Sequence, residues 1–203
     1  MKPSPWRGPV LGLALCLMPL AAGAQGVDCA AGAGPDALLQ CDLQRAELIR
    51  ARAETYYGEP QTSLVEITDT ASPSGSAYVY DVLTDGDALH LKAGSVPDGR
   101  GPRCRLETTL PMDTAAELRA LLEQTADEAL PGYGPREEVT LNPDGSRHVR
   151  MVFDSHDIIT RADTPDGLRQ FSRHAGSDDP VNRLNNLVIG FANLSSAWNC
   201  KTS

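Results

Sequence analysis

The amino-acid sequence predicts an α+β protein in which about three helices pack on one face of a mostly antiparallel sheet. Two observations lead to this prediction. Apolar residues recur at helical spacing in three separate stretches, and alternating or β-branched runs bounded by turn residues occupy much of the chain between them. Helices and antiparallel strand runs in this order are typical of the α+β class. A split into two lobes at residues 131–135 is the alternative organisation.

The first half of the chain predicts one long helix followed by four strands. Residues 35–57 carry apolar side chains at three- and four-residue spacing, and the Gly-Glu-Pro run at 58–60 ends that pattern. Arginine and glutamate residues supply most of the opposite helix face. Turn sequences then separate short alternating runs, so we expect an antiparallel meander. The four strands are expected at residues 64–70, 77–83, 88–93 and 103–110.

A second helix and a hairpin follow the meander. Residues 113–117 have the pattern of a capping box, and leucines then trace one side of a helix that the Pro-Gly pair at 131–132 terminates. Residues 137–141 and 146–153 flank an Asn-Pro-Asp-Gly sequence whose proline and glycine suit a tight turn. These two runs are therefore expected to form a hairpin.

The last part of the chain predicts one more strand and one more long helix. The strand is expected near residues 158–161, and a short helix is expected after Pro165. Asp179 and Pro180 have the residue types of an N-cap and of the first helical position. Apolar residues as far as Trp198 then form one face of a final helix.

The first 24 residues have the features of a secretory signal. Lys2 and Arg7 precede an apolar run at residues 10–20, and an Ala-Gly-Ala sequence ending at residue 24 has the small-x-small pattern of a cleavage site. The apolar run has about half of the roughly 20 residues that a membrane-spanning helix needs. We therefore expect cleavage after residue 24 and a single domain over residues 25–203, located in the periplasm or outside the cell without membrane insertion.

The cysteines predict two structural disulfides. Cys29, Cys41, Cys104 and Cys200 remain after removal of the signal, and an even number in an exported protein indicates disulfide bonds. No Cys-x-x-Cys pair of the kind used in redox or zinc sites is present. Among the three possible pairings we expect Cys29–Cys41 together with Cys104–Cys200, the second of which would tie a strand to the last helix.

The charge of the protein argues against two classes of partner. The net formal charge is −9, and removal of residues 1–24, which hold two basic and no acidic residues, changes it to −11. Nucleic acids and anionic lipids attract basic surfaces, so we expect neither as a partner. The sequence also has no phosphate loop or dinucleotide fingerprint, and we expect no cofactor.

Catalytic motifs are absent from the sequence. It has no Gly-x-Ser-x-Gly elbow, and no two histidines have the helical i, i+4 spacing of a zinc protease. Asp154 and His156 share a face of an extended segment, and two aspartates follow His174. The alternative function is a small cell-envelope hydrolase or metal-assisted enzyme with a site near these residues. In the leading interpretation, the protein is not an enzyme and binds no metal.

Four arginines favour binding. Arg103 and Arg105 share one face of a predicted strand, and Arg147 and Arg150 lie in the later hairpin. In an acidic protein, such a local basic surface can recognise a carboxylate-bearing partner; a solvated sheet face with cross-strand Arg–Glu pairs is the alternative. We therefore expect a non-catalytic protein of the inhibitor, immunity or accessory type that binds another protein or a cell-envelope component.

Overall fold

The fold is taken from a computed structural model, which describes residues 33–57, 62–70, 76–97, 101–134, 137–151 and 156–201. The predicted signal segment, Cys29 and Asp154 lie outside these ranges. In the described residues the chain has three helices and a mostly antiparallel sheet of seven strands, which confirms the predicted α+β class. The elements in chain order are α1 (Pro35–Tyr57), β1 (Val65–Asp69), β2 (Ala77–Asp85), β3 (Ala88–Val96), β4 (Arg103–Thr109), α2 (Met112–Thr125), β5 (Glu137–Leu141), β6 (Arg147–Met151), β7 (Asp157–Thr164), β8 (Gly167–His174), α3 (Pro180–Leu194) and β9 (Asn199–Lys201).

The large sheet combines strands from both halves of the chain. Its order is β8-β7-β1-β2-β3-β4-β9, and every pairing between neighbours is antiparallel. The predicted meander is confirmed as β1 to β4. The later β7–β8 hairpin pairs with β1, and β9 pairs with the other end of the meander at β4. Strands that follow the connector at residues 131–135 thus extend the same sheet as those that precede it.

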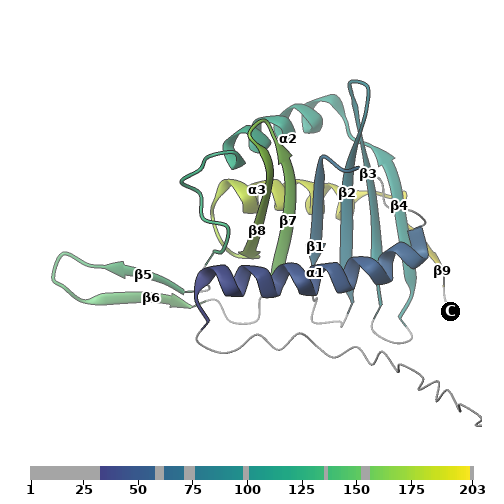
Figure 1. Ribbon diagram of the computed structural model, residues 1–203. Helices are drawn as coiled ribbons and strands as arrows, with labels where there is room; N and C mark the ends of the chain where they lie inside the picture. The colour runs from purple at the N-terminus through teal and green to yellow at the C-terminus, as the bar shows by residue number, and fades with distance from the viewer. Residues whose placement is uncertain are drawn as a thin grey trace, which may run out of the picture.

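The three helices cover both faces of the sheet. α1 crosses one face at a steep angle to the strands, whereas α2 and α3 lie on the opposite face (Figure 1). The expectation that all helices pack on one face was therefore wrong. The physical reason is that α1 has its own contacts with the sheet, which are two small apolar clusters around Ala53 and Leu43.

The main hydrophobic core lies between the sheet and the helix pair α2 and α3. It contains the alternating inward residues of the strands, such as Ile67 and Leu91, together with Leu118 of α2 and Leu184 of α3. These side chains are almost fully buried. Because successive side chains of a strand point to opposite faces of the sheet, the strand residues outside this core project toward α1. That face carries more polar groups, and they form the site described below.

The ends of two predicted helices differ from the expectation. α2 ends at Thr125, several residues before the Pro-Gly pair, and its N-cap is Pro111 without a side-chain hydrogen bond, so no capping box forms. Asp113 instead accepts a hydrogen bond from the backbone N–H of Thr114 at 2.8 Å. α3 begins as predicted, because Asp179 accepts from the backbone N–H of Asn182 at 2.9 Å.

A strand replaces the short helix expected after Pro165. β7 turns back into β8 through a tight turn in which Gly167 has a φ of 107°. Residues with a side chain rarely adopt this backbone conformation, whereas glycine adopts it without a steric cost. At the C-terminal end, the predicted last helix stops at Leu194, and Trp198 lies beyond it with its indole N–H donating to the Ala192 carbonyl at 2.8 Å.

One disulfide is present in the described residues. Cys104 and Cys200 are bonded, as predicted, but the bridge joins β4 to β9 and not to the last helix. The reason is that the chain leaves α3 before Cys200 and adds a three-residue strand at the sheet edge. The other predicted bridge needs Cys29, which lies outside the described residues, so the Cys29–Cys41 pairing stays a prediction.

The connector before the small hairpin is attached to the sheet by Arg173. This side chain on β8 is 1% exposed and donates hydrogen bonds to the carbonyls of Pro131 and Gly132 at 2.7 and 2.9 Å. Its Nε donates to Asp179 at 2.5 Å, so the residue that caps α3 also neutralises this buried cation. Arg173 therefore joins three segments of the chain at one point.

The hairpin predicted at residues 137–153 is confirmed as β5 and β6, which form a separate two-stranded sheet. It extends away from the β8 side of the large sheet (Figure 1). Gly145 has a φ of 82° in its turn. Leu141 and Val149 on this hairpin are exposed. No helix in the described part of the chain is long and apolar enough to cross a membrane.

Candidate binding site

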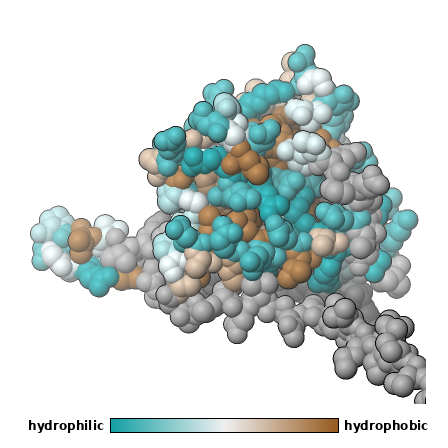
Figure 2. Space-filling view, viewed as in Figure 1, coloured by the Kyte–Doolittle hydropathy of each residue, from teal (hydrophilic) through white to brown (hydrophobic). Residues whose placement is uncertain are grey.

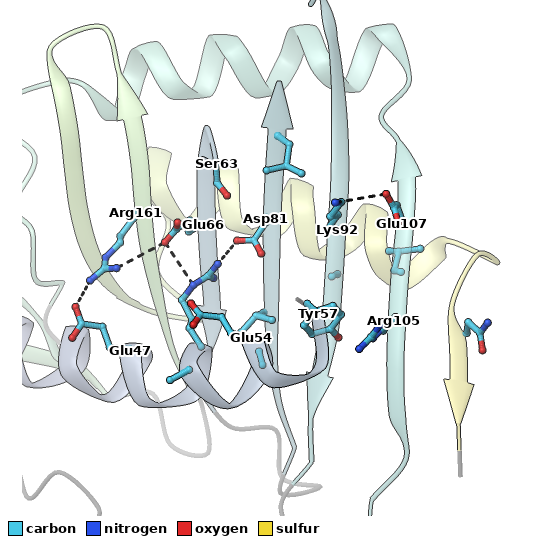
Figure 3. A pocket seen from close by; sticks show the side chains of 18 of the residues that line it. Glu47, Glu54, Tyr57, Ser63, Glu66, Asp81, Lys92, Arg105, Glu107 and Arg161 are labelled. Carbon is cyan, nitrogen blue, oxygen red and sulfur yellow. Dashed lines mark hydrogen bonds and ion pairs between the residues drawn. The ribbon is translucent and has the colours of Figure 1, made fainter. Parts of the chain in front are cut away.

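A cavity of about 900 Å³ lies between α1 and the sheet. Its walls come from one side of α1 and from six strands of the large sheet, which are β1, β2, β3, β4, β7 and, at one end, β9. In the space-filling view, hydrophilic side chains gather in the middle of this face, above α1 (Figure 2). Its charged and hydroxyl-bearing lining residues are Glu47, Arg50, Glu54, Tyr57, Ser63, Glu66, Asp81, Lys92, Arg105, Glu107 and Arg161 (Figure 3).

Strand alternation explains why charged side chains line this cavity. Glu66 lies between Val65 and Ile67, and Asp81 lies between Tyr80 and Val82; all four of these neighbours are buried in the main core. Because successive side chains point to opposite faces of a sheet, the charged residues must project toward α1. The α1 face of the sheet is therefore polar for the same reason that the opposite face is apolar.

One end of the cavity, over β7, β1 and β2, is closed by a chain of ion pairs. Arg50 of α1 donates a hydrogen bond to Asp81 and lies 3.6 Å from Glu66. Arg161 of β7 contacts Glu47 of α1 at 2.6 Å and lies 3.9 Å from Glu66 (Figure 3). Each of these two arginines thus bridges α1 and the sheet, and both have carboxylate partners.

The other end of the cavity, over β3 and β4, is built around Tyr57. Its hydroxyl donates to the Cys104 carbonyl at 2.9 Å, and its ring lies directly over Gly94 of β3. A Cβ atom at position 94 would lie 1.0 Å from the hydroxyl oxygen of Tyr57, so only glycine leaves room for the ring. Burial raises the pKa of Tyr57 to about 12, while the neighbouring positive charge of Arg105 opposes this increase.

Arg105 and Lys92 are the cations at this end of the cavity. The Arg105 guanidinium lies 4.9 Å from the centre of the Tyr57 ring, a cation–π geometry. Lys92 on the next strand lies 3.8 Å from Glu107. Within the described ranges, Arg105 has no carboxylate partner, whereas the other three cations of the lining do. The β3–β4 end therefore presents a positive charge that the protein itself leaves available.

The structure brings together some of the predicted arginines and separates others. Arg103 and Arg105 lie on β4, and both are exposed. Arg147 is exposed on the projecting β6, which extends from the opposite side of the sheet (Figure 1). The side chain of Arg150 lies outside what the structure describes. Arg103 and Arg147 thus lie on separate parts of the molecule, and of the three predicted arginines whose side chains the structure describes, only Arg105 lines the cavity.

The predicted histidines contact two different aspartates. Nε2 of His156 lies 3.3 Å from Asp69, and Nδ1 of His174 lies 3.7 Å from Asp157. Asp69 is two residues after Ile67, so the Asp69–His156 pair lies on the same face of the sheet as the main core. Asp157 is adjacent to His156, so the Asp157–His174 pair projects to the opposite face. In the part of the chain that the structure describes, no three His, Cys, Asp or Glu residues come close enough to hold a metal ion. Asp154 lies outside it.

The contribution of α1 was not recognised from the sequence. Its charged residues, including Arg50 and Glu54, have the spacing of an ordinary solvent-facing helix surface. The one local signal is Gly94, directly after the strand expected at residues 88–93, because a glycine in a strand often marks a close approach of another group and β3 continues through this position. Here the approaching group is Tyr57 from the end of the same helix.

Comparison of the chain with protein-family models, with curated protein sequences and with solved structures finds no match to any of them.

Proposed function

We propose that this protein is an exported, non-catalytic binding protein that holds a carboxylate-bearing group of another protein or of a cell-envelope component in the cavity between α1 and the sheet. The observation that supports this proposal is Arg105. It is a cation of the cavity lining that has no carboxylate partner in the described residues. Guanidinium groups bind carboxylates through charge-assisted, geometrically specific hydrogen bonds.

The cavity has the size and chemistry that this function needs. Its volume of about 900 Å³ falls within the range of pockets that hold small molecules or chain ends. Ala51, Ala53, Val79 and Leu83 supply apolar surface beside the charged groups. An acidic protein repels most anions at long range. Arg105, which has no carboxylate partner among the described residues, would therefore select a ligand by short-range contact. The ligand is thus expected to combine a carboxylate with an apolar portion.

Export is the second component of the proposal and rests on the sequence. The features of residues 1–24 predict a cleaved signal, and a disulfide such as Cys104–Cys200 is stable in an oxidising compartment. We therefore propose that the protein acts in the periplasm or outside the cell. Amino-terminal sequencing of the protein recovered from its host should begin at Gln25; recovery of the full-length chain from the cytoplasm would contradict this location.

The binding function can be tested by affinity selection. Oxidised protein beginning at residue 25 would be incubated with two peptide libraries of random sequence, one with free carboxyl ends and one with amidated ends, and bound peptides would be identified by mass spectrometry. We expect retention from the free-acid library only. Arg105→Gln should abolish this retention, because the neutral amide cannot replace the charge of the guanidinium.

The matched control is Arg183→Gln. Arg183 is an exposed arginine on α3, and α3 lies on the opposite face of the sheet from the cavity. This variant should retain the same peptides as the wild-type protein. Equal retention by the Arg105 and Arg183 variants, or equal retention of free and amidated peptides, would refute the proposed site.

A further inference from the structure

Asn199 lies directly opposite Arg105 across the pairing of β4 and β9. Residues that face each other in an antiparallel pair project from the same face, with Cβ atoms about 4.5 to 5.5 Å apart. Both side chains line the cavity. On the other neighbouring strand, the residue opposite Arg105 is Gly94, which has no side chain and is covered by Tyr57. Arg105 therefore has one polar cross-strand neighbour, and it is Asn199.

The amide of Asn199 is available for a ligand. Neither Asn199 nor Arg105 makes a hydrogen bond or ion pair through its side chain within the ranges that the structure describes. A side-chain amide carries two N–H donors, and a guanidinium carries five. Two adjacent sets of donors without acceptors, one of them cationic, match the two oxygen atoms of a single carboxylate.

The disulfide fixes the position of Asn199. Cys104 and Cys200 are the next pair in the same register, so the covalent bond joins the two strands one residue away from the Arg105–Asn199 pair. β9 has only three residues, and all of them are exposed. Burial contributes little to holding such a short strand, and the disulfide adds a covalent attachment to its backbone pairing with β4.

We infer that Arg105 and Asn199 together bind the two oxygens of one ligand carboxylate, and that the Cys104–Cys200 disulfide positions Asn199 for this contact. The inference rests on the proposed function and adds to it a second specificity residue and a dependence on disulfide oxidation. A planar carboxylate at a free chain end suits this pair of donors, with Tyr57 providing an aromatic surface beside it. An amidated chain end lacks both the charge and the second acceptor oxygen.

The test is a titration of the oxidised protein that is monitored by ¹⁵N NMR. N-acetylalanine is the probe, and N-acetylalanine amide is its uncharged counterpart. The side-chain signals of Arg105 Nε and Asn199 Nδ2 should shift with one common dissociation constant, and the amide should shift neither. Asn199→Ala should weaken binding of N-acetylalanine roughly tenfold to a hundredfold, the range expected for one lost hydrogen bond to a charged group.

Two further variants complete the test. Asn193→Ala removes an exposed asparagine from α3 and should leave the dissociation constant unchanged. Cys104→Ser/Cys200→Ser should weaken binding as much as Asn199→Ala does, because it releases β9. Binding by the folded double variant that is as tight as that of the wild-type protein would overturn the role of the disulfide. If circular dichroism shows that the double variant is unfolded, the titration is repeated with the reduced wild-type protein, and Asn199→Ala decides the role of Asn199.

The possible results separate the inference from the function on which it rests. Unchanged binding by Asn199→Ala, together with loss of binding by Arg105→Gln, would overturn the role of Asn199 and leave the proposed function intact. Unchanged binding by both variants would overturn the proposed function as well.

Discussion

Replacement of Gly94 by alanine should displace the Tyr57 ring and open the β3–β4 end of the cavity. The added Cβ would lie 1.0 Å from the hydroxyl oxygen and 1.7 Å from Cζ of Tyr57. These distances are far below any tolerable contact, and the atoms belong to a rigid ring that is held by a hydrogen bond. The ring must therefore leave its position over β3.

The cost can be estimated from the contacts that would be lost. The hydrogen bond from Tyr57 to the Cys104 carbonyl contributes about 1 kcal/mol, and the contact with Arg105 contributes about 0.5 to 1 kcal/mol. We expect a loss of about 2 kcal/mol in the free energy of unfolding. With a urea m-value of about 2 kcal/mol/M, the midpoint would fall by about 1 M.

The assay is a double-mutant cycle in urea with Tyr57→Ala as the second change. Gly94→Ala should cost about 2 kcal/mol in the wild-type background and close to zero when Tyr57→Ala has already removed the ring. A full cost in both backgrounds would show that the Gly94→Ala change acts through the strand itself, and no cost in either would show that the ring does not lie over Gly94. Either result refutes the reasoning.

Three further predictions concern stability. Arg173→Met should lower the free energy of unfolding by about 3 to 5 kcal/mol, because it removes the cation that pairs with Asp179 and the donor to the Pro131 carbonyl, and urea unfolding would measure the loss. A cost below about 1 kcal/mol would contradict the anchoring role. The double variant Cys104→Ser/Cys200→Ser removes a disulfide with a sequence separation of 96 and should lower the free energy of unfolding by about 4 to 5 kcal/mol in the same assay. If reduction of the wild-type protein does not lower its stability, this prediction is wrong. The raised pKa of Tyr57 means that the unfolded chain loses its phenol proton from about pH 10 upward while the native protein keeps it until about pH 12, so stability should fall as the pH rises through this interval. Tyr57→Phe should show a shallower fall over the same interval, and identical profiles would argue against a buried phenol.

The periodic elements of the fold were predictable from the sequence, and the elements that depend on tertiary contacts were not. The helix at residues 35–57 and the four meander strands have apolar periods, although β2 and β3 continue beyond the expected ends at residues 83 and 93. β9 has three exposed residues and no period, and it exists because the disulfide and β4 hold it. β8 follows a Thr-Pro pair that resembles a helix start, but pairing with β7 stabilises the extended form.

The candidate site was predictable only where it depends on a single strand. Alternation placed Arg103 and Arg105 on one face of β4, and both project there. The sequence could not predict that α1 would lie over that face and supply Tyr57, because the packing of a helix on a sheet joins residues far apart in the chain. Because the four arginines share a charge, the sequence predicts that they form one basic surface. In the structure they lie on two separate elements, β4 and β6, whose relative position the sequence could not predict.

The order of strands in the sheet has a consequence for the way the protein folds. β1 pairs with β7 and β4 pairs with β9, so two of the six strand pairings of the large sheet join the meander to strands from the last quarter of the chain. Such non-local contacts carry a large loop-closure cost before they contribute any stability, and proteins rich in them refold in milliseconds to seconds. A chain that is still emerging from the ribosome or crossing a narrow pore lacks β7, β8 and β9. It therefore cannot complete its sheet, and the entire polypeptide must be released before the native state forms.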